Sequence, residues 1–321
     1  MVFHEPIIPV HNSNGHRRTA VIVHNKVNSP TKLPISAERP ATTDQPPATD
    51  DQPLVTVVIP SYNHAQFIGQ AIRSVVDQTY KNLELIVIDD GSTDGSASVV
   101  KNILAKVGPF DGKLFAQDNM GAHYTINRGI SLARGDYIAI LNSDDYYYPQ
   151  RIERLLAKAM HDGCDFVFSK IDHVSDKGFH LNDTGRIRSS YLSAYSGVGR
   201  YPHIGDVLLG YNLAVTTSNF FMKKSLVDKV GLFHDYQLVH DWDFLLRVLL
   251  VSEPCFVDEP LLAYRVHDHN TLFARAHLSR RELGRMFRAY AAALAEGQRR
   301  NPHAPARFPA HVRAMFRDLP D

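Results

Sequence analysis

Apolar and polar residues alternate along the chain with two periods, one typical of buried strands and one typical of helices. Residues 54–60 form a continuous run rich in β-branched side chains, which predicts a strand buried on both faces. In residues 66–79 the apolar positions recur three and four apart, which predicts an amphipathic helix. Residues 83–88 are apolar again and predict a second strand. This part of the chain therefore begins with a strand–helix–strand unit.

The same alternation continues as far as residue 163. Helical periodicity occurs at 96–107, 121–134 and 149–160, and short apolar runs predict strands at 113–116 and 137–141. Pro149 falls in the first turn of its predicted helix, a position that proline favours. Repeated strand–helix–strand units imply a mostly parallel sheet that is flanked by helices and connected by right-handed crossovers. We therefore expect an α/β fold.

Beyond residue 164 the pattern loosens. Strands are predicted at 166–168, 214–222 and 255–257, and helices at 225–230, 241–250 and 280–297. Residues 172–212 show no clear period and are expected to form loops and edge strands. We divide the folded part of the chain into 54–163, 164–274 and an Arg-rich helical C-terminal extension, 275–321.

Residues 1–53 differ from the rest of the chain. They contain eight of the 18 prolines, mixed with small polar residues. Proline fixes φ and lacks a backbone donor, so we expect a poorly ordered tail or linker here. A short apolar piece at 19–24 leaves open a single strand that docks elsewhere.

The composition excludes several classes of protein. The 321 residues are 44% hydrophobic and 21% charged, as in ordinary soluble proteins, and the net charge of +1 argues against a nucleic-acid-binding protein. Two cysteines, Cys164 and Cys255, are too few for a disulfide framework or a cysteine-based zinc site, and they fit a reducing compartment. No apolar run reaches the roughly 18–20 residues that span a bilayer, and the N-terminus lacks the order of a signal peptide. We expect a soluble, cytoplasmic protein.

Polar residues follow three of the predicted parallel strands at their carboxyl ends. They are Ser61, Tyr62 and Asn63, then Asp89 and Asp90, then Asn142, Ser143, Asp144 and Asp145. Because the carboxyl ends of parallel strands meet at one edge of a sheet, we expect these side chains to lie close together. The four carboxylates would repel one another, and a hard divalent cation would offset their charge. The alternative is that each acidic segment is only a turn and helix cap, which is less expected for two segments on one edge.

Three segments of the chain resemble a known family. No G-x-G-x-x-G follows the first strand and no G-x-x-x-x-G-K-[ST] is present, which argues against dinucleotide oxidoreductases and P-loop ATPases. Instead, the nucleotide-sugar half of the family 2 glycosyltransferases is similar to VTVVIPSYNHAQFIGQAIRSVVDQTY, LELIVIDDGSTDGS and NMGAHYTINRGISLARGDYIAILNSDDYYYPQRI, in this order. The resemblance covers about residues 54–270. It implies a GT-A fold, a Rossmann-like sheet in which 54–163 binds the nucleotide sugar and 164–274 binds the acceptor and carries the base.

The resemblance implies a set of residues that bind the nucleotide sugar: Pro60, Tyr62, Asn63, Asp89, Asp90, Gly121, Asn127 and Asp144. Tyr62 would lie beside the base, and Asp90 would accept a hydrogen bond from the NH of a uracil-type ring. Gly121 and Asn127 match a segment that approaches the nucleotide and the donor sugar.

The family's D-x-D element corresponds to Ser143-Asp144-Asp145 and implies a divalent cation, Mn²⁺ or Mg²⁺. In the family the last acid, here Asp145, binds the metal, and the middle acid, here Asp144, contacts the ribose or metal-bound water. Ser143 departs from the family pattern, which has Asp at this place, and this departure weakens the expected metal site little. His267 and Asn270, in YRVHDHNT, match a segment that approaches the metal or the diphosphate. A structural loop histidine is the competing interpretation of His267.

The family also carries an acidic pair at the start of a helix, and its second acid is the general base. Here His240 takes the first place and Asp241 the second. At about 100° per residue, Asp241 shares a face with apolar residues, whereas Asp243 points away and lies four residues before Arg247. Asp243 is therefore expected to pair with Arg247 or to face solvent. Asp241 is therefore predicted to face the interior, where apolar walls raise its proton affinity. A simple helix N-cap is the alternative.

The resemblance implies an inverting glycosyltransferase that moves a sugar, most plausibly from a UDP-sugar, to a saccharide or lipid-linked acceptor in glycan or polysaccharide biosynthesis. A non-catalytic nucleotide-sugar-binding protein and a retaining transferase on the same fold remain open. Residues 275–321 hold ten arginines and four acids. We expect either a packed helix with solvated charges or a peripheral contact with the inner face of the membrane.

Overall fold

The computed structural model describes residues 52–181, 195, 198, 201–267, 270 and 279–316. The predicted tail, 1–53, lies outside the described residues except for its last two positions, so its order is not tested.

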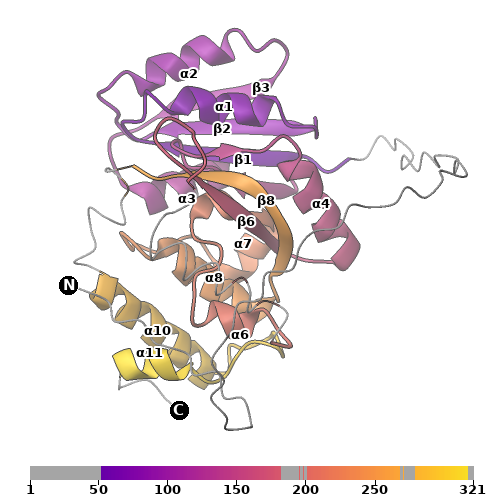
Figure 1. Cartoon of the computed structure of the whole chain (residues 1–321), viewed down its shortest axis with the longest axis vertical. Helices are drawn as coiled ribbons and strands as arrows, with labels where there is room; N and C mark the ends of the chain where they lie inside the picture. Colours follow the sequence, from indigo (N-terminus) through magenta and orange to yellow (C-terminus); the bar gives the residue numbers. More distant parts are fainter. Residues whose placement is uncertain are drawn as a thin grey trace, which may run out of the picture. The chain divides into compact units, whose positions relative to one another are not determined.

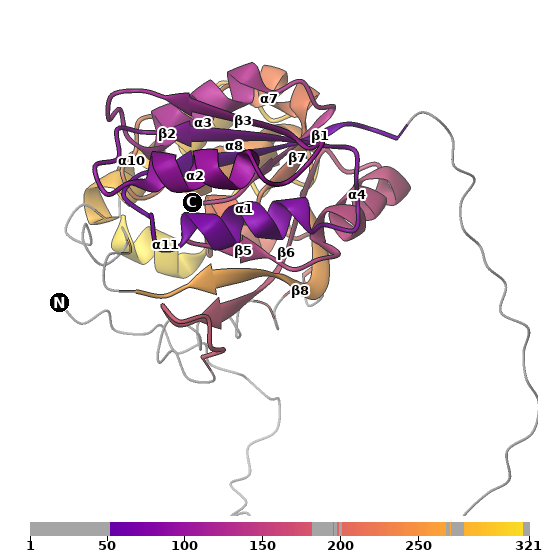
Figure 2. The same ribbon diagram turned by 90° about the horizontal axis from the view of Figure 1, so that it is seen from above.

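The first half of the chain forms the parallel part of the sheet, as predicted. Four strands pair side by side in the order β3-β2-β1-β4: β3 Asp111–Ala116, β2 Leu83–Asp89, β1 Val55–Ser61 and β4 Tyr137–Ile140. The helices between them are α1 Ile68–Val76, α2 Ser96–Leu104 and α3 Ala122–Leu132, and α4 Arg151–Asp162 follows β4. In Figure 2 α1 and α2 lie on one side of these strands and α3 on the other.

Successive side chains of β1 pack into two different cores, one on each face of the sheet. Val57 and Ile59 of β1 pack in one core with Ile72 of α1, and Val58 packs in a second core with Ile130 of α3. All five side chains are at most 3% exposed. Strand residues project alternately to the two faces, so a strand covered on both sides is apolar throughout.

A glycine allows α3 to approach the sheet closely. A Cβ atom at Gly129 would lie 2.2 Å from a methyl carbon of Val58, which is closer than packed atoms tolerate. The missing side chain therefore sets the separation of α3 from β1.

The second half extends the same sheet but mixes strand directions. β7 Phe221–Lys223 pairs antiparallel with β4, and β6 Phe166–Val174 pairs antiparallel with β7. β8 Cys255–Arg265 runs parallel to β6, and the two-residue β5, Tyr146–Tyr147, pairs antiparallel with the far side of β8. The described residues thus form one eight-stranded sheet, in which β8 is long and bent (Figure 1).

Helices of the second half cover one face of this sheet. They are α6 Gly205–Leu208, α7 Lys224–Val230, α8 His240–Val251, α10 Ser279–Ala295 and α11 Ala310–Met315. α8 is buried among aromatic side chains, with Phe244 stacked on Phe233 at 4.3 Å between ring centroids. Phe287 of α10 packs edge-on against Trp242 of α8.

Three sequence-based predictions of local structure are wrong. The strand predicted at 214–222 is reduced to β7, because Thr217–Asn219 forms a 3-10 turn in which Ser218 N–H bonds the hydroxyl of Thr216. Pro149 precedes α4 instead of lying in its first turn, since the helix begins at Arg151 after Gln150. β6 and β8 extend well beyond the predicted 166–168 and 255–257.

The inference of two reduced thiols is also wrong. Cys164 and Cys255 form a disulfide, with their Cα atoms 6.1 Å apart and 91 residues between them in sequence. The bond joins the first residue of β8 to a residue two positions before β6. The cysteines therefore give no support to a reducing compartment.

The helices of the described ranges are all too short or too polar to cross a membrane.

Candidate active site

The carboxyl ends of β1, β2 and β4 meet at one edge of the sheet, as predicted. Nδ1 of His64, just after β1, lies 2.8 Å from Oγ of Ser143, which follows β4. The backbone N–H of His64 donates to Oγ of Ser96, beyond β2, at 3.0 Å. Hydrogen bonds from one loop therefore connect the ends of all three strands.

Asp90 organises the segment that leads into α3. Its Oδ1 accepts hydrogen bonds from Gln117 Nε2 at 2.7 Å and Met120 N at 2.9 Å, and its Oδ2 accepts one from Gly121 N at 2.9 Å. Asp90 is 3% exposed. The carboxylate predicted to contact a base thus also holds the backbone of Gly121 in place.

The two carboxylate oxygens of Asp89 differ in their hydrogen bonding. Its Oδ2 accepts a hydrogen bond from Ser92 N at 3.2 Å, whereas its Oδ1 is buried without a hydrogen-bond partner among the described residues. Ser61, its register partner on β1, also has a buried hydroxyl without a partner in this part of the chain. A buried polar atom that lacks a partner is costly unless a ligand or water satisfies it.

The residues after β1 present an aromatic ring to solvent. Tyr62 is 48% exposed, and Pro60 is half-buried. Asn63 has φ of 53°, the left-handed conformation that asparagine tolerates, and its Oδ1 accepts a hydrogen bond from Thr93 N at 2.8 Å. The turn at Asn63 therefore leaves Tyr62 available for stacking.

Asn127 has a structural partner. Its Nδ2 donates to the carbonyl of Phe233 and its Oδ1 accepts from Phe233 N–H, both at 2.8 Å. This reciprocal pair joins α3 to the segment before α8. The predicted approach of Asn127 to the donor sugar is not tested.

Asp145 is held inside the protein. Oδ2 accepts a hydrogen bond from Ser218 Oγ at 2.6 Å, and Oδ1 accepts one from Arg265 N at 2.8 Å. Asp145 is 1% exposed. Burial, and next the negative charge of Asp144, raise the pKa of Asp145 well above its usual value. Both of its oxygens thus have partners in the protein, although the sequence predicts that it binds the metal.

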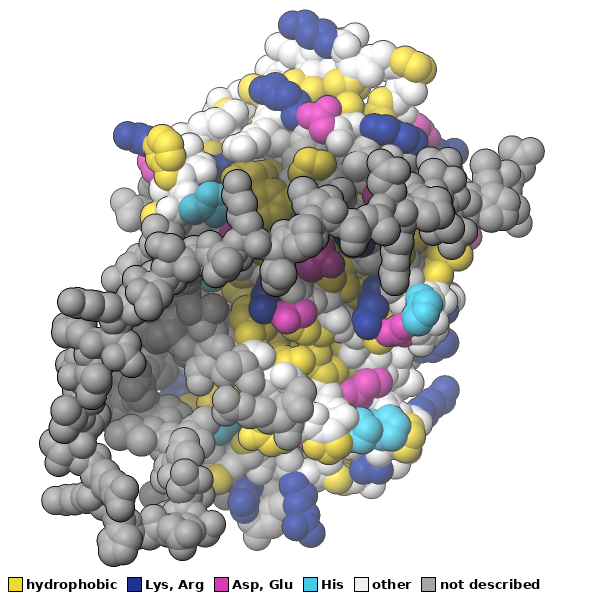
Figure 3. All heavy atoms as spheres, turned by 45° about the vertical axis from the view of Figure 1, so that its right-hand side comes forward, with side chains coloured by type: hydrophobic (Ala, Val, Ile, Leu, Met, Phe, Trp, Pro, Cys, Tyr) yellow, Lys and Arg dark blue, Asp and Glu magenta, His cyan; other side chains and the backbone are white. Residues whose placement is uncertain are grey.

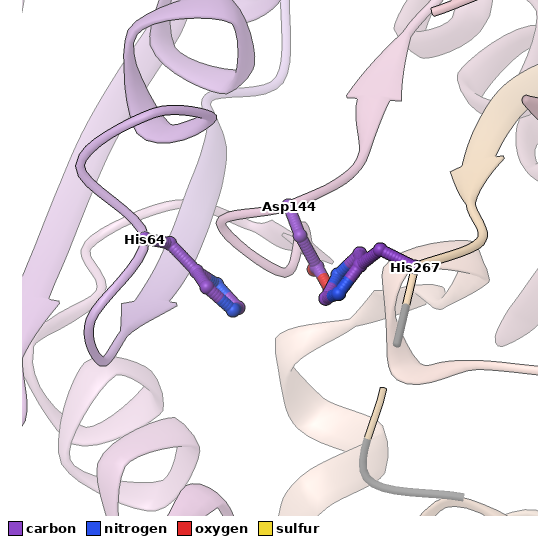
Figure 4. Close-up of side chains that lie close together, drawn as sticks. All are labelled: His64, Asp144 and His267. Atoms are coloured by element: carbon purple, nitrogen blue, oxygen red, sulfur yellow. The ribbon is translucent and has the colours of Figure 1, made fainter. Parts of the chain in front are cut away.

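Asp144 lies instead with two histidines (Figure 4). Asp144 Oδ2 is 3.1 Å from Nε2 of His267. One ligand atom each of His64, Asp144 and His267 lies within 4.8 Å of the others. Burial alone would raise the pKa of Asp144, but the hydrogen bond with His267 and the nearby His64 outweigh it and lower that pKa. This set of imidazole and carboxylate donors suits a divalent transition metal.

Arg265 fixes the relation between Asp144 and His267. It is 2% exposed, and its Nε donates to the carbonyl of Asp144 at 2.7 Å while its backbone N–H holds Asp145. Two residues later, the backbone N–H of His267 donates to Oδ1 of Asn270 at 2.6 Å. The predicted Asn270 therefore shapes the loop that presents His267.

Asp241 lies in the first turn of α8 and is 8% exposed. Burial raises its pKa to about 6, in the direction predicted for a base, although hydrogen bonds from Trp242 N and Asn212 Nδ2 oppose the rise. The segment that begins at Asn212 returns to β4, where Thr216 Oγ1 accepts from Nδ2 of Asn142 at 3.0 Å. One short segment therefore contacts Asp241 and the loop that carries Asp144.

Asp243 forms an ion pair with Arg247, which is one of the two alternatives expected from the sequence. Arg247 Nε donates to Asp243 Oδ2 at 3.0 Å, and His234 Nδ1 lies 3.0 Å from the same oxygen. Asp243 is 3% exposed, so it is buried although it lies opposite Asp241 on the helix. The neighbouring His240 is neutral near pH 7, because burial lowers its pKa to about 4.

Sequence reasoning missed His64, Arg265 and Asn212 as parts of this site. His64 and Arg265 lie one and two residues from predicted site residues, so extending each motif would have included them. Asn212 lies in a stretch without periodicity, and its contact with Asp241 spans 29 residues, so no local signal identifies it.

Comparisons with known proteins agree with this architecture. Residues 56–231 match the sequence model of glycosyl transferase family 2. An uncharacterized glycosyltransferase of Rickettsia typhi is 31% identical over 227 residues, which cover 68% of this chain and 66% of that protein, just under two thirds of its length.

Two solved structures share the fold. Residues 1–349 of Staphylococcus aureus TarS, in complex with UDP-GlcNAc, align with a TM-score of 0.61 and 18% identity, over 82% of this chain and 70% of that one. The mannosyltransferase PcManGT of Pyrobaculum calidifontis, in complex with GDP-Man and Mn²⁺, aligns with a TM-score of 0.59 and 17% identity, over 84% of this chain and 73% of that one. The predicted GT-A fold is thereby confirmed.

Proposed function

The chain belongs to glycosyl transferase family 2, and we propose that it is an inverting glycosyltransferase that moves a sugar from a nucleoside-diphosphate sugar to an acceptor hydroxyl in glycan or polysaccharide biosynthesis. One observation carries this proposal. Asp144 and His267 lie 3.1 Å apart at the carboxyl edge of the sheet, and the segment from Asn212 to Ser218 connects this edge to the buried carboxylate of Asp241.

The donor binds at the ends of β1 and β2 in this proposal, and a UDP-sugar is the expected donor. TarS, which shares the fold, was solved with UDP-GlcNAc. The exposed ring of Tyr62 is available to stack on the base, and Asp90, next to Asp89, would accept a hydrogen bond from a uracil-type ring. Asp90 supports this pocket by holding Gly121.

Asp144 and His267 would hold the divalent cation, Mn²⁺ or Mg²⁺. Their donor atoms fit such an ion in chemistry and in separation. When bound, the cation offsets the negative charge that develops on the departing diphosphate. Asp145, predicted from the sequence to be the metal ligand, would instead buttress the loop through Ser218 and the backbone of Arg265.

Asp241 would act as the general base. Its carboxylate takes the proton of the acceptor hydroxyl while the hydroxyl oxygen bonds to the anomeric carbon. The bond between that carbon and the diphosphate oxygen breaks on the opposite face, so the configuration inverts. With a pKa of about 6, Asp241 is ionised near pH 7 and still basic enough to accept a proton.

A lipid-linked acceptor and a peripheral membrane contact are consistent with the C-terminal helices. Residues 279–316 hold eight arginines and two glutamates. Arg281, Arg285 and Arg288 are exposed and share one face of α10. Figure 3 shows Lys and Arg side chains at the lower edge of the face that it draws. Glu282 of α10 accepts a hydrogen bond from Leu238 N at 2.8 Å, so this face adjoins the segment that leads to Asp241.

A thermal-shift screen tests the donor and the cation together. UDP-, GDP- and dTDP-sugars are each added with Mn²⁺, with Mg²⁺ or with a chelator. We expect the largest rise in Tm with a UDP-sugar and Mn²⁺, and loss of most of that rise with the chelator, since a ligand that binds only the folded state stabilises it. No rise with any nucleotide sugar would contradict the proposal.

A further inference from the structure

His64 lies beside the Asp144–His267 pair, and nothing in the proposed reaction requires it. The rings of His64 and His267 are 5.9 Å apart between centroids and nearly perpendicular. Figure 4 shows the two imidazoles pointing toward one another from different segments of the chain, with Asp144 between them. His64 comes from the loop after β1, and His267 follows β8.

The hydrogen bond between His64 and Ser143 suits a metal ligand. Nδ1 of His64 is 2.8 Å from Oγ of Ser143, the residue before Asp144. When Nδ1 carries the proton and donates it to this hydroxyl, Nε2 carries the lone pair, and a neutral imidazole of this kind is the form that binds a metal ion. Metal-ligating histidines are usually oriented in this way, by a hydrogen bond from the other ring nitrogen.

The packing around His64 limits the movement of its ring. The backbone N–H of His64 bonds Ser96 Oγ, and that of Ala65 bonds Asp94 Oδ2 at 2.8 Å. The ring of Phe67 is edge-on to His64 at 5.9 Å. The imidazole is therefore held at the site by contacts outside it.

We propose that His64 is a third protein ligand of the cation, so that the site presents two imidazoles and one carboxylate. The proposal deepens the proposed function and rests on it. Imidazole suits transition metals, whereas Mg²⁺ prefers oxygen ligands and gives up its water reluctantly. We therefore expect the site to bind Mn²⁺ and Co²⁺ with higher affinity than Mg²⁺.

Pulsed electron paramagnetic resonance of bound Mn²⁺ counts the coordinating nitrogens directly. The full chain is titrated with Mn²⁺ and UDP, and nitrogen couplings are recorded for the wild type, His64→Ala and His267→Ala. We expect two imidazole couplings in the wild type and one in each variant. We also expect His64→Ala to lower Mn²⁺ affinity about tenfold or more, with a smaller change for Mg²⁺.

Ser143→Ala and His303→Ala are the companion variants. Ser143→Ala keeps both imidazoles but removes the hydrogen bond to His64, so both couplings should remain with weaker Mn²⁺ binding. His303 is exposed and remote in sequence from the site, and its variant should bind Mn²⁺ like the wild type.

The outcomes separate this inference from the proposed function. A single coupling in the wild type, lost in His267→Ala and retained in His64→Ala, would overturn the third ligand and leave the proposed cation site intact. Absence of Mn²⁺ binding to the wild type would overturn both. Because the wild-type spectrum alone distinguishes one nitrogen from two, the test does not depend on the folding of any variant.

Discussion

Asp241 and Asp243 lie two residues apart on α8, yet their surroundings assign them opposite tasks. Among the described residues, the one side chain that donates a hydrogen bond to Asp241 is that of Asn212, whereas Asp243 is paired with Arg247. Burial raises the pKa of Asp241 from 3.8 to about 6. The energetic cost of keeping Asp241 ionised is consistent with a group that is kept for catalysis rather than for stability.

The Asp241→Asn variant should lose activity and gain stability. Removal of a general base is expected to lower kcat about 10³-fold, with the affinity for UDP unchanged. Because the pKa is higher in the folded protein, the folded state binds more protons between pH 3.8 and 6, and stability falls as pH rises through that range. Above this range, the ionised carboxylate lowers the free energy of unfolding by at most about 3 kcal/mol, and a neutral amide at the same position avoids that cost. Urea unfolding and a pH–rate profile of the wild type, expected to rise through about pH 6, check this.

Asp243→Asn serves as the matched control on the same helix. It leaves Arg247 buried without its carboxylate, so the free energy of unfolding should fall by roughly 3 kcal/mol. The folded fraction should keep its turnover and the same acidic limb. If Asp243→Asn abolished turnover while Asp241→Asn did not, the assignment of the base would be reversed.

At single positions, the sequence was informative where local geometry decides the outcome. The helical period placed Asp241 and Asp243 on different faces and left Asp243 either paired with Arg247 or facing solvent, and the pair is what forms. It did not predict the partners of Asp145, because Ser218 and Arg265 lie 73 and 120 residues away. Contacts of that span depend on how the strands pair, which no local pattern specifies.

The disulfide connects two elements that the sequence did not place together. β6 and β8 are parallel neighbours, and the bond closes a loop across 91 residues near their first residues. At its other end β8 finishes at Arg265, two residues before His267, and the Arg265 guanidinium donates to the carbonyls of Ser175 and Asp176, which follow β6. The bond therefore restricts the unfolded chain and ties the strand that presents His267 to its neighbour.

Reduction, or Cys164→Ser with Cys255→Ser, should lower the free energy of unfolding by up to about 4–5 kcal/mol, as loop closure of this length predicts. Urea unfolding with and without reductant measures the effect. The double serine variant, which has no disulfide, should not respond to reductant. An unchanged midpoint for the reduced wild type would show that the bond contributes nothing to stability.

The exposed arginines of α10 should govern binding to anionic membranes. Each arginine near such a surface contributes about 1 kcal/mol, so replacing Arg281, Arg285 and Arg288 by Gln should weaken binding roughly 10²-fold. Co-sedimentation with phosphatidylglycerol-containing vesicles, and with pure phosphatidylcholine vesicles for comparison, measures this.

A second triple variant removes the same charge elsewhere. Lys81, Lys101 and Lys106 are exposed residues outside the C-terminal helices, and their change to Gln should leave vesicle binding intact. Equal losses in both triple variants would mean that net charge, and not this face of α10, causes the attraction.

Elements with a strong period were predicted well, and irregular ones were not. β1, β2 and α1 follow from continuous or amphipathic runs that are fully used by the core. The segment 214–222 looked like a strand, but its polar side chains form a 3-10 turn that supplies Ser218 to Asp145. A segment that serves the site is therefore shaped by its hydrogen bonds more than by its apolar residues.

At the scale of the whole molecule, one sheet runs through both halves of the chain, to which the proposal assigns the donor and the acceptor. The parallel strands β2, β1 and β4 bring the acidic ends together, which their order in sequence predicted. The mixed part, β7, β6 and β8, brings His267 to the same edge. This was not predictable, because β6 and β8 pair although they lie far apart in sequence, and no local pattern specifies such a pairing. The proposed cation site is thus assembled from both halves of the chain.

The position of a bound cation tests this account most directly. Crystals grown with UDP and Mn²⁺ and measured at the manganese absorption edge would give one anomalous peak for each bound ion. We expect a peak within bonding distance of Asp144 and His267, adjacent to the diphosphate, with Asp145 still bonded to Ser218. A diphosphate bound with no peak there, or a peak held by Asp145 without Asp144, would contradict it.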